Sequence, residues 1–484
     1  MIDKLHHLEQ EARKLDPSRE VREHLAQKVL ANTEVFLEDL PGQKAYLPTN
    51  SDADVSSLGL SENPEDIENI LTTFDHHVVK EGINPASGGH LGYIPGGGLY
   101  PSALGDFLAD ISNKYAGLFY PAPGAVRLEN LLIRWMCDLM GFPETASGNL
   151  TSGGSISNLV AVVTAREASG VKARDFEKLV VYTSDETHHS LLKALKIAGL
   201  GEVKLGIIPL DHSLRMEIDH LKDQITQDRA EGLIPFFING SLGTTNTGTV
   251  DPIDVLADIA EENKIWFHVD AAYGGFFKLV PSLSDKFKGI ERADSITLDP
   301  HKGLFLPFGT GAILVKDVAM MQKAHAFSAD YLQDLVNTEN QVNPADVSPE
   351  LTKHFRGVRL WLPLKLFGLG PFRAALEEKV LLANYFHEEI QKIPGFQVDE
   401  KPDLSVATFR FLPENEDPNE FNKKLIKSVV DDGRIFLSST TINGNFWIRV
   451  AVLIFRCHKQ EIELLLDILK EKATILSREL SDAK

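Results

Sequence analysis

The chain has 484 residues, of which 43% are hydrophobic and 24% charged, as in a globular protein large enough to form more than one domain. Its formal net charge of −20 argues against nucleic acid and anionic membrane surfaces as partners. Two cysteines, Cys137 and Cys457, are too few for a disulfide framework and suit a reducing compartment. The sequence shows no apolar signal segment at its start and no apolar run of membrane-spanning length, so we expect a cytoplasmic protein without a membrane partner.

The first 99 residues predict helices without a sheet of their own. Apolar residues recur at helical spacing up to Phe36, Pro41-Gly42 ends this pattern, and Asn63-Pro64 opens a second one. Two such helices cannot form a good core alone, so their apolar faces need either the main domain or a second subunit. A glycine-rich stretch follows at residues 88–98, and its interleaved His and Tyr residues make it a candidate pocket wall rather than a plain loop.

Residues 150–315 alternate between short apolar runs and helical patterns. This alternation of strand and helix patterns predicts βαβ units and a mostly parallel sheet. The expected strands include residues 179–183, 203–208, 233–238 and 265–269. Ligands of such sheets bind beyond the carboxyl ends of the strands, where His188, Thr245 and Asp270 all fall.

A run of small residues, Thr151 to Ser155, leads into a helix. The free amides and the positive dipole end of a helix N-terminus attract an anion, and we expect Gly154 and Ser155 to make that contact. A turn of this kind alone is more often an ordinary helix cap. The neighbouring histidines His188 and His189 could suggest a metal, but adjacent side chains diverge and no Cys or acid completes a ligand set. Because the turn precedes a helix and an Asp and a Lys follow it further along the chain, we expect a phosphate site rather than a plain cap, and we expect no metal site.

Two clusters carry the strongest chemical signal: His268-Val-Asp-Ala-Ala-Tyr273 and Asp299-Pro-His-Lys302. The first is an apolar run that delivers a carboxylate at a strand end, and the second presents an amine. A Lys amine is a nucleophile toward an aldehyde. A pyridine-ring cofactor needs both groups, because the Lys forms the Schiff base and the carboxylate keeps the ring nitrogen protonated. Either residue alone would more often be structural.

With these clusters the chain resembles the pyridoxal-phosphate-dependent decarboxylases, the group that includes aromatic-L-amino-acid and glutamate decarboxylases, from about Leu15 to the C-terminus. The resemblance implies an α/β protein of the fold-type-I transferase fold. Its large domain (residues 100–368) would hold a mostly parallel seven-stranded sheet, followed by a smaller α+β domain (369–484). The N-terminal helical segment (1–99) would wrap the other protomer of a homodimer, with active sites at the interface.

The resemblance also implies roles around the cofactor, pyridoxal 5′-phosphate. Lys302 would hold the cofactor, Asp270 would pair with its ring nitrogen, and His188 would stack on the ring. Further cofactor contacts are implied for Gly154, Ser155, Thr245, Ala272 and His301. Asp299 stands where many relatives have Asn near the phosphate. An ionised carboxylate there would repel the phosphate, so we expect it to face elsewhere or to pair with a cation.

On the substrate side, the resemblance implies contacts from Tyr93, Ile94, Pro95, Leu118 and Arg449. Members that act on aromatic substrates typically carry Phe in place of Ile94, and an aromatic residue in place of Leu118. Tyr331 lies in a polar stretch, residues 325–350, that predicts a mobile loop. It matches the family's catalytic-loop tyrosine, the proposed proton donor, with His188 as the fallback.

We therefore predict a pyridoxal-phosphate-dependent carboxy-lyase that converts an L-amino acid into its amine and carbon dioxide. Aromatic, acidic and small aliphatic amino acids all remain open as substrates. The alternatives are an aminotransferase or carbon–carbon lyase on the same fold, and a cofactor-binding protein without turnover. The loop with Tyr331 argues against the aminotransferase, and the intact Asp270, His301 and Lys302 argue against a protein without turnover.

Overall fold

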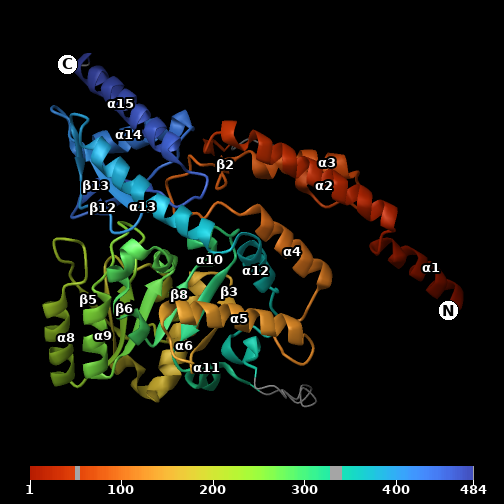
Figure 1. Cartoon of the computed structure of the whole chain (residues 1–484), viewed down its shortest axis with the longest axis horizontal. Coiled ribbons are helices and arrows are strands. Elements are labelled where there is room, and N and C mark those ends of the chain that lie inside the picture. The colour runs from red at the N-terminus through yellow and green to blue at the C-terminus, as the bar shows by residue number, and fades with distance from the viewer. Residues whose placement is uncertain (50–54, 328–340, 483–484) are drawn as a thin grey trace.

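The computed structural model describes residues 1–49, 55–327 and 341–482, and its largest element is a seven-stranded sheet (Figure 1). The strand order is β3-β9-β8-β7-β6-β4-β5, and the five strands from β8 to β5 run parallel. β9 runs antiparallel to both of its neighbours. The strands are β3 (Ser147–Thr151), β4 (Leu179–Ser184), β5 (Lys204–Ile208), β6 (Ile234–Ser241), β7 (Trp266–Ala271), β8 (Ser295–Leu298) and β9 (Gly311–Val315). The predicted mostly parallel α/β sheet is confirmed.

The central strands are apolar along their length because both faces of the sheet are covered. In β4, Val180 and Tyr182 belong to one core, whereas Leu179 and Val181 belong to another. Successive side chains of a strand point to opposite faces, so these two cores lie on opposite sides of the sheet.

Helices cover the two faces. On one side α6 packs against β8 and β9, with α7 and α11 beside it, and on the other α9 packs against β6 and β7, with α8 beside it. α5 packs on β3 and on α12, which in turn lies along α4. These helices are α4 (Tyr100–Ser112), α5 (Pro123–Met140), α6 (Gly154–Ser169), α7 (Ser190–Ile197), α8 (Ile218–Ala230), α9 (Ile253–Asn263), α11 (Val318–His325) and α12 (Gly357–Phe367).

The register of the central strands fixes where their ends meet. Asp270 on β7 lies opposite Ser241 on β6 and opposite Thr297 on β8. The loops that follow these strands therefore emerge together at the carboxyl edge of the sheet. The one-turn helix α10 (Pro300–Gly303) follows β8 at this edge and carries Lys302.

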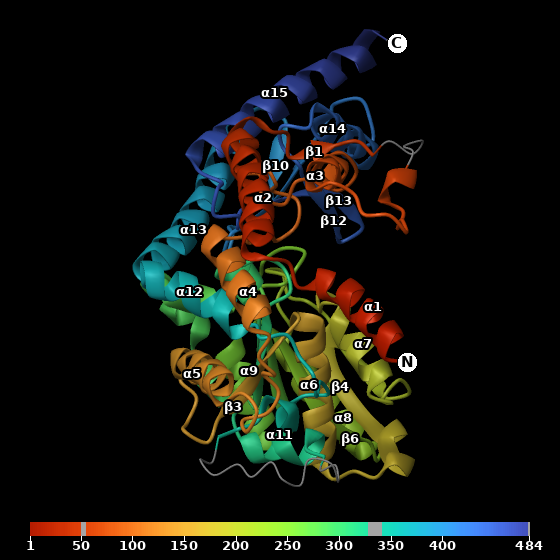
Figure 2. The ribbon, with the colours of Figure 1, turned by 90° about the vertical axis from the view of Figure 1, so that its right-hand side faces the viewer.

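The C-terminal residues form a second, smaller α+β unit. Its four strands are antiparallel in the order β10-β11-β13-β12. Together with three helices they enclose a separate apolar core. In both views α15 lies at the end of the molecule far from the seven-stranded sheet (Figures 1 and 2). The elements are α13 (Gly370–Ile390), β10 (Phe396–Val398), β11 (Val406–Phe411), α14 (Pro418–Asp432), β12 (Ser438–Ile442), β13 (Asn445–Ala451) and α15 (Lys459–Asp482).

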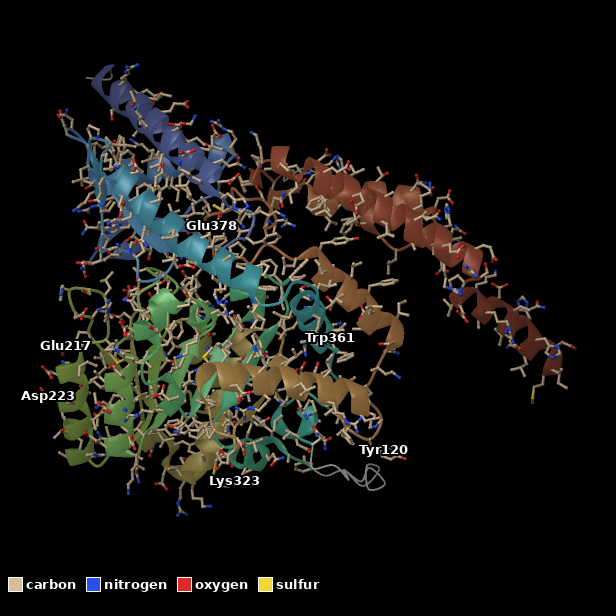
Figure 3. All side chains as sticks on the ribbon, in the orientation of Figure 1. Tyr120, Glu217, Asp223, Lys323, Trp361 and Glu378 are labelled. Carbon is tan, nitrogen blue, oxygen red and sulfur yellow. The ribbon has the colours of Figure 1, made fainter. Side chains whose placement is uncertain are left out.

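The N-terminal helices project from the rest of the chain, and many of their side chains stand clear of it (Figure 3). None of the residues of α1 or α2 is buried, and apolar residues such as Val21 and Val29 are 47% and 45% exposed. Within the described residues, no helix combines the length and the apolar character needed to cross a membrane. The elements of this segment are α1 (Ile2–Ala12), α2 (Arg19–Asp39), β1 (Tyr46–Leu47), α3 (Ile67–Phe74) and β2 (Gly82–Ile83).

Candidate active site

A cavity of about 300 Å³ opens at the carboxyl edge of the seven-stranded sheet. The loops after β3, β4, β6, β7 and β8 line it, as expected for a ligand site in an open parallel sheet. The lining includes every residue for which we expected a cofactor contact: Gly154, Ser155, His188, Thr245, Asp270, Ala272, His301 and Lys302. Residues up to 150 positions apart in the sequence thus share one cavity.

A larger cavity, about 560 Å³, lies at the opposite edge of the sheet, where Leu179, Ile234 and Trp266 begin their strands. One cation of its lining, Arg292, is already paired with Asp258 and Glu261, each at 2.6 Å. The smaller cavity is instead lined by a carboxylate, an imidazole and an amine, those of Asp270, His188 and Lys302. We therefore assign the chemistry to the smaller cavity.

The Asp270 carboxylate is held at the end of β7 by two donors. Asn158 Nδ2 donates to its Oδ2 at 3.0 Å, and the Ala272 amide donates to its Oδ1 at 3.2 Å. Both bonds hold the carboxylate in a fixed orientation. A carboxylate so placed can pair with a protonated ring nitrogen in the cavity.

Asn158, on the first turns of α6, has a fully paired side chain. Its amide nitrogen also donates to Ser190 Oγ at 2.9 Å, and its Oδ1 accepts from Thr297 Oγ1 at 2.6 Å and from His268 Nε2 at 3.1 Å. Four polar side chains thereby fix which way the amide points. Sequence reasoning did not identify Asn158 as a site residue, because a polar residue near the start of a helix carries no sign of a partner 112 positions away.

His268 is buried and its Nε2 contacts the side-chain oxygen of Asn158. Its Nδ1 lies 2.9 Å from Ser295 Oγ, which itself accepts from Trp266 Nε1 at 2.9 Å. Because Nε2 faces the acceptor oxygen of Asn158, the hydrogen of the neutral ring sits on Nε2, and Nδ1 accepts from the Ser295 hydroxyl. Burial lowers the pKa of His268 to about 4, so the imidazole is neutral at physiological pH.

His188 reaches the same network through Ser190. Its Nδ1 lies 2.7 Å from Ser190 Oγ and also accepts from the Ser190 amide at 3.3 Å. Because Nδ1 accepts, the ring hydrogen of neutral His188 sits on Nε2. Burial lowers the pKa of His188, which favours this neutral form. A hydrogen-bonded path thus runs from Asp270 through Asn158 and Ser190 to His188.

Lys302 is paired at the other end of the cavity. Its Nζ lies 3.2 Å from Asp299 Oδ2, and His301 Nε2 lies 3.7 Å from the same oxygen. The expectation that Asp299 pairs with a cation is therefore confirmed, whereas the alternative that it faces away from the site is wrong. The carboxylate is buried and lines the cavity, and its Oδ1 has no partner among the described residues.

The predicted phosphate cradle lies beside Asp299. α6 begins at Gly154, and a Cβ there would lie 3.1 Å from Asp299 Oδ2 and 3.4 Å from Ala272 Cβ, closer than a side chain comfortably allows. The preceding Gly153 has φ +152°, which also favours glycine. The small residues thus bring the free amides of a sixteen-residue helix to the cavity wall.

The expected substrate contacts are placed differently. Tyr93, Ile94, Pro95, Leu118 and Arg449 are not part of the lining formed by the described residues. The loop after Tyr93 nevertheless packs on α10, since a Cβ on Gly96 would lie 2.5 Å from His301 O and 2.9 Å from Lys302 O. Tyr331 falls outside the described residues.

Arg449 is buried and bound to backbone on two loops. Its Nε donates to Asn246 O at 2.7 Å, its Nη1 donates to Gly92 O at 3.3 Å, and its Nη2 donates to Thr245 O. In this arrangement it ties the glycine-rich loop to the loop after β6.

The lining residues fit pyridoxal phosphate. Asp270 offers a carboxylate for the ring nitrogen, Lys302 an amine for the aldehyde, and the start of α6 free amides for the phosphate. A buried carboxyl oxygen of a lining residue, Glu186 Oε2, has no partner among the described residues. Buried polar atoms are normally paired, so the lining is built for contacts that the protein alone does not supply.

Comparisons with known proteins agree with this fit. The model of the pyridoxal-dependent decarboxylase conserved domain matches residues 49–412. The aromatic-L-amino-acid decarboxylase of Bacillus atrophaeus is 34% identical over 408 residues, which cover 83% of this chain and 85% of the relative. The phenylacetaldehyde synthase of Petunia hybrida is 30% identical over 435 residues, which cover 85% of this chain and 86% of that relative.

The fold agrees as well. A crystal structure of Oryza sativa TDC with PLP and tryptamine superposes with a TM-score of 0.90, covering 95% of this chain and 99% of that chain. At 22% identity this likeness supports the fold. The family model, by contrast, spans about three quarters of the chain and includes the cavity with Asp270 and Lys302. The resemblance inferred from the sequence is confirmed: the chain belongs to the pyridoxal-dependent decarboxylase family and is a carboxy-lyase that uses pyridoxal phosphate.

Proposed function

We propose that the chain decarboxylates an aromatic L-amino acid, giving the corresponding amine and carbon dioxide. The observation that carries this proposal is the convergence of Lys302, Asp270 and His188 on one cavity of about 300 Å³. Support for the aromatic class comes from the relatives, which include the aromatic-L-amino-acid decarboxylase of Bacillus atrophaeus and a tyrosine decarboxylase of Narcissus pseudonarcissus that is 30% identical.

Bound pyridoxal phosphate supplies an electron-withdrawing ring that accepts the electron pair left behind when carbon dioxide departs. The task of Asp270 is to hold a proton on the ring nitrogen. Asn158 and the Ala272 amide keep its carboxylate oriented for that task. Lys302 would supply the amine that holds the cofactor at its aldehyde carbon, and the amides at Gly154 and Ser155 would hold the phosphate.

His188 and Ala272 would bound the two faces of the ring. A flat imidazole on one face excludes water and presents its Nε2 hydrogen to the carboxylate of the substrate. A methyl group at Ala272 leaves room for the ring, whereas a larger side chain there would enter the cavity that this residue lines. Thr245 and His301 complete the contacts around the ring and its phosphate side. Tyr331, by resemblance, would deliver the proton to the α-carbon of the substrate.

We further propose a homodimer with active sites at the interface. None of the residues of α2 is buried, and on α4 Phe107 is 60% exposed and Ile111 is 74% exposed. Faces of this kind on long helices need a partner. Leu118 lies outside the cavity of its own chain and is 9% exposed, and its role in the site of the partner subunit rests on the resemblance. Tyr93, Ile94 and Pro95 would line the substrate side, and Arg449 would hold their loop in place.

The division of the chain at residues 99 and 368 stays a prediction, as does the cytoplasmic location. The separate apolar core of the C-terminal unit supports the division at residue 368, and so does the end of α12 at Phe367. The cytoplasmic location is supported by Cys137 and Cys457, which are both buried and unpaired.

The test is direct. The purified protein, loaded with pyridoxal phosphate, is incubated with a panel of aromatic, acidic and aliphatic L-amino acids, and carbon dioxide, amine and aldehyde are measured. We expect carbon dioxide and amine in equal amounts from an aromatic substrate. Asp270→Asn should keep the cofactor and lose most of the activity. Activity confined to acidic or aliphatic amino acids would overturn the proposed substrate class.

A second outcome is favoured by one relative, the Petunia hybrida phenylacetaldehyde synthase. The name of that relative gives an aldehyde as the product, and forming an aldehyde in place of the amine would also require a two-electron oxidant such as dioxygen and the release of ammonia. The product measurement separates the two reactions on the same substrate.

A further inference from the structure

Glu186 is a cavity residue that the proposed reaction leaves without a role. It lies in the loop after β4, two positions before His188, and lines the cavity. Its Oε1 accepts a long hydrogen bond, 3.3 Å, from Asn246 Nδ2. Its Oε2 is buried and has no partner among the described residues. A buried carboxyl oxygen without a partner is costly, so it indicates a contact that a ligand completes.

The charges around Glu186 come from several elements. Arg449 on β13 attracts it, whereas Asp185 on the same loop and Asp251 after β6 repel it. His188, Asp270 and Lys302 line the same cavity. The balance is governed by burial, which raises the pKa of the Glu186 carboxyl above its ordinary value in spite of Arg449. The carboxyl therefore keeps its proton to a higher pH than an exposed Glu.

The order of the strands tells which part of the cofactor would face Glu186. Across the sheet the order runs β3, β9, β8, β7, β6, β4. The phosphate cradle follows β3, Lys302 follows β8, Asp270 ends β7, and Glu186 follows β4. The phosphate anchor and Glu186 thus lie on opposite sides of Asp270.

Pyridoxal phosphate has its ring nitrogen and its aldehyde carbon at opposite positions of the ring. The phosphate arm leaves one of the two edges between them, and a hydroxyl and a methyl group occupy the other. If Asp270 holds the nitrogen, Lys302 the aldehyde and Gly154 the phosphate, the hydroxyl edge must turn toward the loops after β6 and β4. Those loops carry Thr245 and Glu186.

We propose that the Glu186 carboxyl binds the ring hydroxyl of pyridoxal phosphate and shares a proton with its oxygen. This inference rests on the proposed placement of the cofactor between Asp270, Lys302 and Gly154. In its acid form Glu186 donates a hydrogen bond to the ring oxygen. The cofactor's second proton, which can sit either on this oxygen or on the nitrogen that joins the cofactor to Lys302, then stays on the nitrogen. When Glu186 loses its proton to solvent, its carboxylate attracts that remaining proton to the ring oxygen.

The two proton positions give bound pyridoxal phosphate different absorbance bands, a visible band for the proton on nitrogen and a near-ultraviolet band for the proton on oxygen. The wild-type enzyme, with cofactor and without substrate, should therefore lose visible absorbance and gain near-ultraviolet absorbance as the pH rises. Glu186→Gln offers an amide that can donate at every pH, so its visible band should stay constant over the range in which the wild type changes. The measurement is the ratio of the two bands against pH.

Asp185→Asn is the matched control, because it removes one carboxylate from the same loop at an exposed position. It should keep the titration of the two bands, with a midpoint moved only slightly toward lower pH, because it removes one charge that repels the Glu186 carboxylate. Glu186→Ala is the second variant if Glu186→Gln does not fold, as judged by circular dichroism, and it too should lose the wild-type titration. Cofactor affinity, measured by fluorescence quenching, should weaken in the Ala variant, which offers the ring oxygen no donor.

Three results would overturn the inference. One is a Glu186→Gln enzyme whose bands titrate as in the wild type. Another is a wild type whose bands do not change with pH. The third is a Glu186→Gln enzyme that alters only the KM for the amino acid, which would make Glu186 a substrate contact. Failure of the proposed function looks different, since a wild type that binds pyridoxal phosphate but releases no carbon dioxide would still allow the band ratio to be measured.

Discussion

Asn158 Nδ2 lies 3.0 Å from Asp270 Oδ2, and this contact joins the carboxylate of the cavity to the buried side chains behind it. Asn158→Ala should remove it and also leave Thr297 and His268 without their acceptor. Each buried group left unpaired costs about 1–3 kcal/mol, so the melting temperature should fall. The freed Asp270 carboxylate should also hold the ring nitrogen less well, lowering kcat.

The control for Asn158→Ala is Asn445→Ala, whose amide makes one exposed hydrogen bond to Asn443 O. Melting temperature and kcat are measured for both variants. If Asn158→Ala lowers the melting temperature but leaves kcat at the wild-type value, the contact with Asp270 is structural only.

Lys302→Ala should abolish both the covalent attachment of the cofactor and decarboxylation while the protein stays folded. The reason is that Lys302 is the amine that lines the cavity together with Asp270. Borohydride treatment followed by mass spectrometry reports the attachment. Lys288→Ala, at a side chain that is 66% exposed, is the control. A borohydride-reducible adduct that persists in Lys302→Ala would assign the attachment to another amine.

Asp299→Asn should bind the cofactor more tightly. The Asp299 carboxylate lies beside the phosphate cradle, where it repels an anion, and its ion pair with Lys302 at 3.2 Å must be broken before the amine can react. Removing one negative charge from a buried site of this kind should lower the Kd for pyridoxal phosphate by roughly tenfold. Titration of the apo-enzyme with cofactor checks the value.

Pyridoxal without the phosphate is the control ligand for Asp299→Asn. If repulsion of the phosphate matters, the gain should be larger for pyridoxal phosphate than for pyridoxal. An equal gain for both ligands would assign the effect to the released Lys302 alone, and a weaker affinity for both would show that Asp299 supports the site.

The chemistry of the site could be predicted from the sequence because its groups stand at recognisable positions. Asp270 ends an apolar strand, Gly154 opens a helix after small residues, and Lys302 sits in a motif. Parallel strands bring such ends to one edge whatever the details of the packing. The same rule placed His188 and Thr245 correctly in the cavity.

What could not be predicted depends on contacts between side chains distant in the sequence. Asn158 meets Asp270 only because α6 packs across the sheet, and no local pattern marks the pair. β9 lies between β3 and β8 and is antiparallel to both. The alternation of strand and helix patterns in the sequence does not reveal this reversal of direction. Glu186 stood within a stretch noted for its histidines, and only its burial and unpaired oxygen distinguish it.

The stability of the protein should fall as the pH drops below neutrality, and His90 contributes. This residue is buried against Tyr93 and Phe436, its ring nitrogens have no partner among the described residues, and burial lowers its pKa from 6.5 to about 4. The unfolded chain therefore takes up a proton near pH 6.5, whereas the folded chain resists it until about pH 4. The contribution of His90 to the free energy of unfolding is fully present above pH 6.5 and is lost as the pH falls toward about 4. The loss is on the order of 3 kcal/mol.

His90→Phe keeps an aromatic ring at this position but cannot titrate. The midpoint of urea unfolding, measured at several pH values between neutrality and the acid limit, should decline less steeply in His90→Phe than in the wild type. His212→Phe, at an exposed position, should leave the slope unchanged. An unchanged slope in His90→Phe would mean that His90 finds a proton acceptor or water in solution.

The last prediction concerns the fate of the substrate's α-carbon, which separates amine formation from aldehyde formation. Tyr331 matches the family's catalytic-loop tyrosine and lies outside the described residues, so its role rests on the sequence. If its hydroxyl protonates the α-carbon after carbon dioxide leaves, Tyr331→Phe should slow amine release on the order of 100-fold, the usual loss for one general acid. Substrate binding should persist, and more carbonyl product should form for each carbon dioxide released, with the amino group left on the cofactor as pyridoxamine phosphate. Amine, carbonyl product and carbon dioxide are measured together for the wild type, for Tyr331→Phe, and for Tyr120→Phe as a control at an exposed tyrosine. If Tyr331→Phe makes amine at the wild-type rate with no carbonyl product, the donor is elsewhere, and His188, whose Nε2 hydrogen faces the cavity, is the next residue to test.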